Sequence, residues 1–323
     1  MGLFPTLADE LRPEVELAAE AGVYVGTSSW KYPGWLGMIY EADRYMVRGR
    51  YAETKFERES LREYAWVFRT VCVDAAYYRF PTREGLEALA MQVPESFRFT
   101  FKVTSEITVK RFPRLPRYGE RGGKENRGFL DAGLFTEAFL GPCEAIRDRV
   151  GMLMFEFSAF HAGDFARGRD FVRELDGFLG RLPRGWRYGV EIRNRSFLHP
   201  EYFAVLRAHG VTHVCNQWTE MPTVEEQMGM EGWETSDEAV AARFLLTPGR
   251  GYEAAVAAFS PYRETRVVDD GARRAGAEMI RRTVPLRRTR TAWIYVNNRL
   301  EGNALQTIRA MLAAARAMGL KKD

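Results

Sequence analysis

The segment Tyr188–Phe197, with the sequence YGVEIRNRSF, begins as an apolar run of strand length and ends in polar residues. Glu191 and Arg193 are two residues apart, so in a strand both side chains point to the same side. A carboxylate and a guanidinium at the end of a core strand are costly to bury unless they pair with each other or meet a ligand. The pattern therefore indicates either a structural ion pair or a ligand site.

A second glutamate, Glu156, closes another strand-like run, Met152–Phe157. If the two strands are neighbours, Glu156 and Glu191 lie within reach of each other, and paired carboxylates can carry out acid–base chemistry such as glycoside hydrolysis. The alternative is that one carboxylate neutralises Arg193 and the other Lys102. Lys102 lies in an otherwise apolar strand, where it either forms a Schiff base or balances Glu156. We take Glu191, Glu156 and Lys102 as the candidate catalytic residues.

Further polar and aromatic side chains follow the ends of the predicted strands. Amide, hydroxyl and carboxylate groups at these positions could orient a ligand, and aromatic rings stack on sugars or nucleobases. Each residue could instead be an ordinary hydrogen-bonding or packing residue of the rim. The candidate ligand-binding residues are Arg193, Asn194, Asn297, Asn298, Ser28, Trp30, Asp74, Tyr78 and Trp218.

Metal and cofactor chemistry finds little support in the sequence. The chain has four histidines, and two of them, His209 and His213, straddle the start of a strand instead of sharing a helix face. The segment Gly119–Glu125 (GERGGKE) is not a phosphate loop, because its spacing is too short and Glu125 stands where Ser or Thr is needed. We expect no metal site and no cofactor.

Strand-like and helix-like segments alternate along the chain, which is typical of parallel β-α-β units in an α/β fold. Eight candidate strands begin at residues 23, 71, 97, 152, 188, 211, 240 and 292. This number predicts a TIM-type (β/α)8 barrel, whose C-terminal strand ends usually form the active face. The competing fold, an open doubly wound sheet, normally has a glycine-rich first turn, and GTSSWKY is not one.

The predicted organisation is one domain with two additions. Residues 1–22 form an N-terminal helical extension, with a helix interrupted at Pro13, and residues 23–323 form the barrel. Residues 105–130 form a basic insertion after the third strand, and its Pro and Gly residues predict an ordered loop without regular structure. Seven of the 47 basic residues lie between Lys110 and Arg127, against two of the 43 acidic residues, so the patch attracts anions locally.

The sequence gives no indication of a membrane or of disulfides. No uncharged run approaches the roughly 18 residues of a membrane span, and the N-terminus lacks a basic-then-apolar signal pattern. The three cysteines have no Cys-x-x-Cys spacing. We expect a cytoplasmic protein without a membrane partner.

Five separated motifs resemble the YecE-like family (domain of unknown function 72). They are GTSSWKYPGW, AYYRFP, FRFTFKVTSEIT, VEIRNRSF and YVNNRLEGNA, and the resemblance extends from Val23 to Leu312. It implies a TIM-type barrel whose biochemical activity is unassigned. It also implies that the family's functional residues correspond to Glu191, Arg193, Asn297, Asn298 and Lys102.

The chain departs from the family pattern at several of these motifs. Where the family commonly has glutamate and asparagine in the second strand, this chain has Cys72 and Asp74. A glutamine followed by prolines after the fourth strand is replaced by Glu156-Phe-Ser. A histidine and a tryptophan after the fifth strand are replaced by Asn194 and Phe197. These differences, together with the basic insertion, imply a subgroup with its own ligand.

Two functions follow as hypotheses. The first is a metal-independent barrel enzyme that acts on a small anionic or sugar-like metabolite at the C-terminal strand ends. The alternative is a nucleic-acid-binding barrel that uses the basic patch and the rim aromatics. We expect Glu191 to serve a ligand, so Glu191→Gln should change the free energy of unfolding by no more than about 1 kcal/mol. A deeply buried structural pair would lose roughly 3–5 kcal/mol.

Overall fold

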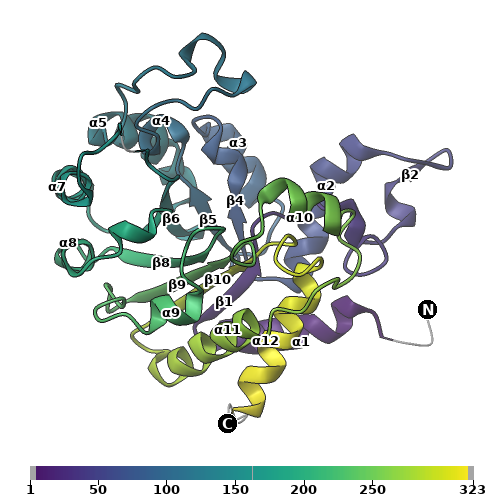
Figure 1. Ribbon diagram of the computed structural model, residues 1–323. Helices are drawn as coiled ribbons and strands as arrows, with labels where there is room; N and C mark the ends of the chain where they lie inside the picture. Colours follow the sequence, from purple (N-terminus) through teal and green to yellow (C-terminus); the bar gives the residue numbers. More distant parts are fainter. Residues whose placement is uncertain (1–4, 162, 319–323) are drawn as a thin grey trace.

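Eight parallel strands close into a barrel in the computed structural model, which describes residues 5–161 and 163–318 (Figure 1). The predicted TIM-type α/β fold is confirmed, and each strand begins within two residues of its predicted start. In order around the barrel, the strands are β1 (Val23–Thr27), β10 (Thr291–Val296), β9 (Ala239–Phe244), β8 (Thr212–Gln217), β7 (Tyr188–Ile192), β6 (Val150–Phe157), β5 (Arg98–Lys102) and β4 (Thr70–Val73).

Helices cover the outside of the barrel, as Figure 1 shows. The prediction that the N-terminal helix breaks at Pro13 is wrong: the helix continues through it, and its apolar face, with Leu11 and Val15, is fully buried. Packing of this face outweighs the local cost of a proline. The α-helices of four or more residues are α1 (Leu7–Glu20), α2 (Glu53–Val67), α3 (Arg83–Ala90), α4 (Ser105–Thr108), α7 (Gly168–Leu179), α8 (Pro200–Ala208), α9 (Val224–Met228), α10 (Tyr252–Phe259), α11 (Asp270–Thr283) and α12 (Ala304–Ala317).

The apolar core has two parts. One lies between the strands and the surrounding helices, and the other fills the inside of the barrel with Cys72, Met152, Met154, Val214 and their neighbours. Within this interior part the Tyr295 hydroxyl donates to Thr100 Oγ1 at 2.6 Å and lies 2.9 Å from Thr70 Oγ1, so β10, β5 and β4 are joined across the barrel. This packed layer forms a floor below the C-terminal strand ends.

Close contact between β1 and β4 depends on Gly26. A Cβ atom at this position would lie 2.3 Å from the backbone carbonyl oxygen of Thr70, a distance that no side chain can occupy. The glycine therefore lets the two strands approach and close the barrel.

The basic insertion is more regular than predicted. It contains α4 and a 3-10 helix at Pro116–Arg121, and a bridge between Arg111 and Glu125 joins its two arms. Figure 1 shows it projecting above the barrel next to α4. The segment that follows contains short helical pieces at Ala132–Leu134, Phe135–Leu140, Gly141–Cys143 and Glu144–Arg149.

Other elements are short. Between β1 and α2 the chain forms a small antiparallel hairpin, which consists of β2 (Met46–Val47) and β3 (Arg50–Tyr51). Single 3-10 turns occur at Pro33–Trp35, Asp43–Tyr45, Asp74–Tyr77, Arg195–Phe197 and Val284–Leu286. Within the described residues, no helix is long and apolar enough to cross a membrane.

Candidate functional site

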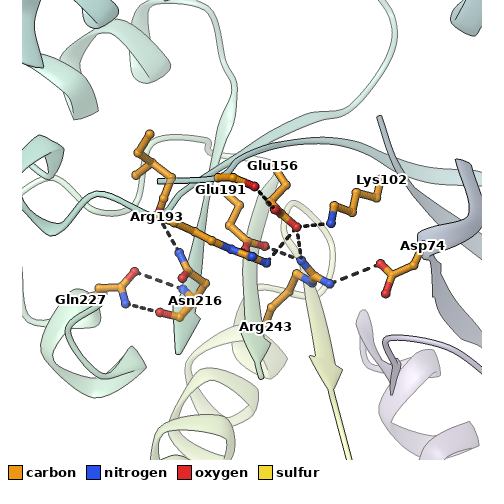
Figure 2. A network of polar contacts seen from close by, with 10 residues as sticks. Asp74, Lys102, Glu156, Glu191, Arg193, Asn216, Gln227 and Arg243 are labelled. Atoms are coloured by element: carbon orange, nitrogen blue, oxygen red, sulfur yellow. Dashed lines mark hydrogen bonds and ion pairs between the residues drawn. The ribbon is translucent and has the colours of Figure 1, made fainter. Parts of the chain in front are cut away.

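The C-terminal ends of β5, β6, β7 and β9 carry a network of buried charges (Figure 2). Glu156 and Glu191 are paired in the register of β6 and β7, which confirms that the two carboxylates lie on adjacent strands. Their side chains are 1% and 0% exposed. Glu191 and Arg193 also point to the same side, as expected from their spacing, because Arg193 Nε lies 3.1 Å from Glu191 Oε1.

Arg243 lies at the centre of this network and was missed in the sequence. Figure 2 shows its guanidinium between the two glutamates on one side and Asp74 on the other. Its Nη1 lies 2.7 Å from Glu191 Oε2 and 3.5 Å from Glu156 Oε2, and its Nη2 lies 3.5 Å from Asp74 Oδ1. Arg243 is only 2% exposed, so its charge has lost nearly all of its hydration. The ion pairs with these carboxylates compensate for that loss.

The remaining two cations each combine an ion pair with an aromatic contact. Lys102 pairs with Glu156, and its Nζ lies 3.8 Å from the centre of the Tyr77 ring. Arg193 Nη2 lies 2.8 Å from Glu156 Oε2, and its guanidinium lies 4.0 Å from the Trp218 ring. A flat ring against a guanidinium or ammonium fixes its position while leaving other edges free.

The electrostatics of the network keep Glu156 ionised. Burial alone would raise the pKa of this carboxyl, but the positive charges of Arg193, Lys102 and Arg243 outweigh burial and lower its pKa to about 2. Burial opposes the charge of Arg243, yet Glu191 and the neighbouring anions raise the pKa of its guanidinium well above its usual value. Below the network, burial raises the pKa of the Cys72 thiol to about 12. The thiol is therefore neutral and inert near neutral pH.

The structure brings some predicted ligand residues to the network and leaves others apart. Asp74 and Trp218 contact it directly through Arg243 and Arg193. Tyr78 is 60% exposed beside Arg117 of the insertion.

Asn194 and the two C-terminal asparagines have backbone partners. Asn194 hydrogen-bonds both backbone polar groups of Phe160 and so holds the loop after β6. Asn297 Oδ1 accepts from the backbone of Arg299, and Asn298 Oδ1 accepts from that of Ala304. These contacts order the turn after β10.

Two further predicted residues, Ser28 and Trp30, follow β1. The hydroxyl of Ser28 is buried, and no hydrogen-bond partner lies within reach among the described residues. Trp30 lines a cleft of about 460 Å³ with Leu61 of α2 and Leu86 of α3, and none of the network residues lines that cleft. Trp30 therefore belongs to a different surface from the charges.

The side-chain amide of Gln227 forms two hydrogen bonds with the backbone of Asn216 at the end of β8. Asn216 N donates to Gln227 Oε1 at 3.1 Å, and Gln227 Nε2 donates to the carbonyl of Asn216 at 2.7 Å (Figure 2). Asn216 Nδ2 in turn donates to the carbonyl of Ile192 at 3.0 Å. These bonds fix β8 next to β7 and so position the strand that carries Glu191.

The basic insertion packs on the rim next to this network. Tyr77, which contacts Lys102, forms an apolar cluster with Val109, Phe112 and Tyr118 of the insertion. Three of the seven cations of the patch are paired with carboxylates: Lys110 with Glu174, Arg111 with Asp164 and Arg121 with Glu106. The patch is therefore less positive than its sequence indicates.

Among residues 5–161 and 163–318, no group of three or more His, Cys, Asp or Glu side chains could hold a metal ion. The three carboxylates at the mouth face cations instead of one another: Glu156, Glu191 and Asp74 all contact Arg243. The charged side chains at the mouth can contribute charge stabilisation, hydrogen bonding and proton transfer.

Comparison with known proteins places this geometry in a family. Residues 24–322 match the model of the family described as "Protein of unknown function DUF72", in agreement with the YecE-like motifs. A DUF72 family protein from Enterococcus faecalis V583 has a solved structure with 20% sequence identity and a TM-score of 0.61, covering 93% of this chain and 97% of that chain. A DUF72 family protein from Thermotoga maritima MSB8 has 22% identity and a TM-score of 0.58, covering 92% and 98%. A search of curated proteins gave no match.

Proposed function

The chain belongs to the DUF72 family, and we propose that it is a metal-independent enzyme acting on a small anionic or sugar-like metabolite at the C-terminal mouth of its barrel. The observation that carries the proposal is the buried network in which Lys102, Arg193 and Arg243 are held by carboxylates. Six charges at the end of a barrel are far more than the packing of strands requires.

The network supports anion binding because its cations lie nearer to solvent than its glutamates. The side chains of Lys102 and Arg193 are each 11% exposed, whereas Glu156 and Glu191 lie beneath them, nearly or fully buried. Apart from Asp74, whose side chain is 35% exposed, a ligand would therefore meet the cations before the carboxylates. Because the carboxylates and rings already hold them in place, little reorganisation is needed when a negative charge develops on the ligand.

The acidic residues have different roles in this proposal. Glu156 stays ionised, so it holds Lys102 and Arg193 in place and does not donate a proton near neutral pH. Of the other two carboxylates, Glu191 lies beneath the cations, so Asp74 is left as the group within reach to exchange a proton with the ligand. Of the two, Asp74 is the more accessible, with a side chain that is 35% exposed. Trp218 and Tyr78 provide ring surfaces for a sugar.

A metabolite screen by thermal shift, with EDTA present, tests the proposal. A ligand at a hundredfold excess over its Kd stabilises the protein by about 2.7 kcal/mol. We expect hits among small anions and sugars, and we expect Arg193→Lys to weaken them because lysine loses the planar fork. Arg288→Gln, an exposed arginine in the loop before β10, is the control. Hits that need a divalent metal, or that Arg193→Lys does not affect, would contradict the proposal.

The nucleic-acid alternative rests on the four cations of the insertion that have no carboxylate partner within the described residues. They are Arg114, Arg117, Lys124 and Arg127, and Arg117 lies against Tyr78 and Tyr118. Binding through phosphate contacts must weaken steeply as salt rises. Titration of single-stranded and duplex oligonucleotides at two ionic strengths decides it, and absent binding at low salt rules it out.

A further inference from the structure

Two arginines at the barrel mouth have no carboxylate partner. Arg250 follows β9 and Arg299 follows β10, the seventh and eighth strands of the barrel along the chain. Both are half-buried, and among the described residues neither lies within ion-pair distance of an acidic group. By contrast, each of Lys102, Arg193 and Arg243 contacts at least one carboxylate. The mouth therefore has positive charge in excess on this side.

Aromatic rings of α10 hold both guanidinium groups. The Arg250 guanidinium lies 4.7 Å from the centre of the Phe259 ring, and that of Arg299 lies 4.6 Å from the Tyr252 ring. Figure 1 shows α10 lying across the end of the barrel. A ring against the guanidinium face fixes the plane of the group but satisfies none of its N–H donors. Arg299 also hydrogen-bonds the Tyr262 hydroxyl, and the remaining N–H groups of the two arginines are left to bind something else.

Four buried donors on β9 and in the loops after β9 and β10 lack acceptors among the described residues. Arg250 Nη1, Arg299 Nε, Arg243 Nε and Asn298 Nδ2 are buried, and none has a hydrogen-bond partner among the described residues. Arg243 and Asn298 are themselves 2% and 0% exposed. Buried donors are normally satisfied, so a group of four indicates a missing acceptor. All four are N–H groups, and the missing partner must therefore supply oxygens or another acceptor.

Nearby acidic residues do not supply that acceptor. Asp269 accepts from Gln217, Thr247 and the backbone of Ala272, and Glu301 is occupied by Arg273. Glu253, in the first turn of α10, is exposed.

The first turn of α10 adds backbone donors at the same place. The helix has eight residues and begins at Tyr252, and its N-cap, Gly251, follows Arg250 and provides no side-chain cap. Free N–H groups at a helix start favour an anion. In TIM-type barrels the loops after strands seven and eight, with the N-terminus of a short extra helix, often bind phosphate.

This side of the mouth is continuous with the charge network. Arg243 of the network lies on β9, the strand that precedes Arg250, and β9 pairs with β10, the strand that precedes Arg299. Asp74 also contacts Arg243 in the network. One ligand could therefore span both sides.

We propose that the loops after β9 and β10, with Arg250, Arg299 and the first turn of α10, form a phosphoryl-binding subsite, and that the ligand is a phosphate monoester of a small metabolite. This inference deepens the proposed function and rests on it. The dianionic phosphoryl group takes the two unpaired guanidinium groups, each of which can donate two parallel hydrogen bonds. The uncharged part of the metabolite then extends toward Lys102 and Arg193, whose own charges are already balanced.

Calorimetric titration with EDTA present tests the subsite, with inorganic phosphate, glucose 6-phosphate and glucose as probes. We expect both phosphates to bind the wild-type protein, and Arg299→Gln or Arg250→Gln to weaken them at least tenfold, because each change removes charge-assisted hydrogen bonds. Arg288→Gln is the matched control and should bind as the wild type does. If Arg299→Gln fails to fold, Arg299→Lys replaces it, and we expect weakened binding there too, because lysine keeps the charge but loses the fork.

The outcomes separate the two proposals. The subsite proposal is overturned if phosphate does not bind the wild-type protein. It is also overturned if phosphate binds Arg299→Gln, Arg250→Gln and the wild type with equal affinity. Non-phosphorylated sugars or carboxylates that bind in an Arg193-dependent and Arg299-independent manner also overturn it, but they leave the proposed function standing. Phosphate binding that depends on Arg299 and Arg250 supports the subsite, whether or not the network takes part in a reaction.

Discussion

The two sides of the barrel mouth treat positive charge in different ways. In the network, Lys102 of β5, Arg193 after β7 and Arg243 of β9 each meet a buried carboxylate, and Glu156 alone contacts all three. On the side of β9 and β10, Arg250 and Arg299 rest on aromatic rings and meet no carboxylate within the described residues. A paired charge is part of the folded structure, and removing its partner leaves it stranded. An unpaired charge can be removed at little cost to the fold, so its purpose is to be sought in a ligand.

The largest effect on stability is expected from Glu191→Gln. This change leaves Arg193 and Arg243, at 3.1 and 2.7 Å, without their shared carboxylate in a fully buried position. We expect a loss of about 3–5 kcal/mol in the free energy of unfolding, measured by denaturant titration. The smaller change of about 1 kcal/mol anticipated for a ligand-serving glutamate assumed less burial than the structure has.

A glutamate in an exposed ion pair provides the matched comparison. Glu174 pairs with Lys110, and its side chain is 44% exposed. Glu174→Gln should change stability by no more than about 1 kcal/mol. Equal losses for Glu174→Gln and Glu191→Gln would mean that burial does not distinguish the network from the surface.

The next effect appears on acidification and concerns Glu156. Its pKa is about 2 in the folded protein, against an ordinary value of 4.5. Ionised Glu156 therefore stabilises the fold above about pH 4.5, and this contribution is lost as the pH falls toward 2, by an amount on the order of 3 kcal/mol. Glu156→Gln lacks this dependence. The stability difference between wild type and Glu156→Gln, from denaturant melts at about pH 6 and about pH 3, should narrow at the lower pH, and a constant difference would contradict the assignment.

The smallest effect is expected on the unpaired side. Within the described residues, Arg299→Gln breaks no ion pair and removes the ring contact with Tyr252 and the hydrogen bond to Tyr262, so stability should change by about 1 kcal/mol or less. Thermal and denaturant melts of Arg299→Gln beside Arg193→Gln measure the contrast directly. If Arg299→Gln were as costly as the loss of a network residue, the distinction between the two sides would fail.

The fold could be predicted from the sequence because the same pattern, an apolar strand-like run followed by a helix-like segment, recurs along the chain. Eight apolar runs separated by helical patterns can close only a few ways, and the five family motifs agree with a barrel. The paired positions of Glu156 and Glu191 followed from the same reasoning, since each closes a strand and the strands are neighbours. Position within a strand is thus readable from alternation alone.

Three functional candidates, Arg243, Arg250 and Arg299, were not predicted from the sequence. They lie in segments where apolar and polar residues do not alternate clearly. Arg243 is a single charge in a short run of alanines and valine, and that strand was the least distinct of the eight. Its small neighbours Ala239 and Ala241 face the same barrel interior, which leaves room for a long side chain. Arg250 and Arg299 lie in loops, and only the folded chain reveals that no acid stands beside them. Pairing is a property of three-dimensional neighbours, so the sequence could not separate the two sides of the mouth.

The packed layer formed by Tyr295, Thr70 and Thr100 affects the order in which ligands can bind to and leave the mouth of the barrel. Hydroxyl contacts and the sulfur side chains of Met152 and Met154 fill the interior below the charges, so the mouth resembles a cup with one opening. If two molecules bind at the mouth together, both must pass through this opening. The one bound nearer to the packed interior must then enter first and leave last. Such an order of release would make departure of the deeper molecule the slow step, and a rapid-mixing experiment would record it as an initial burst of product.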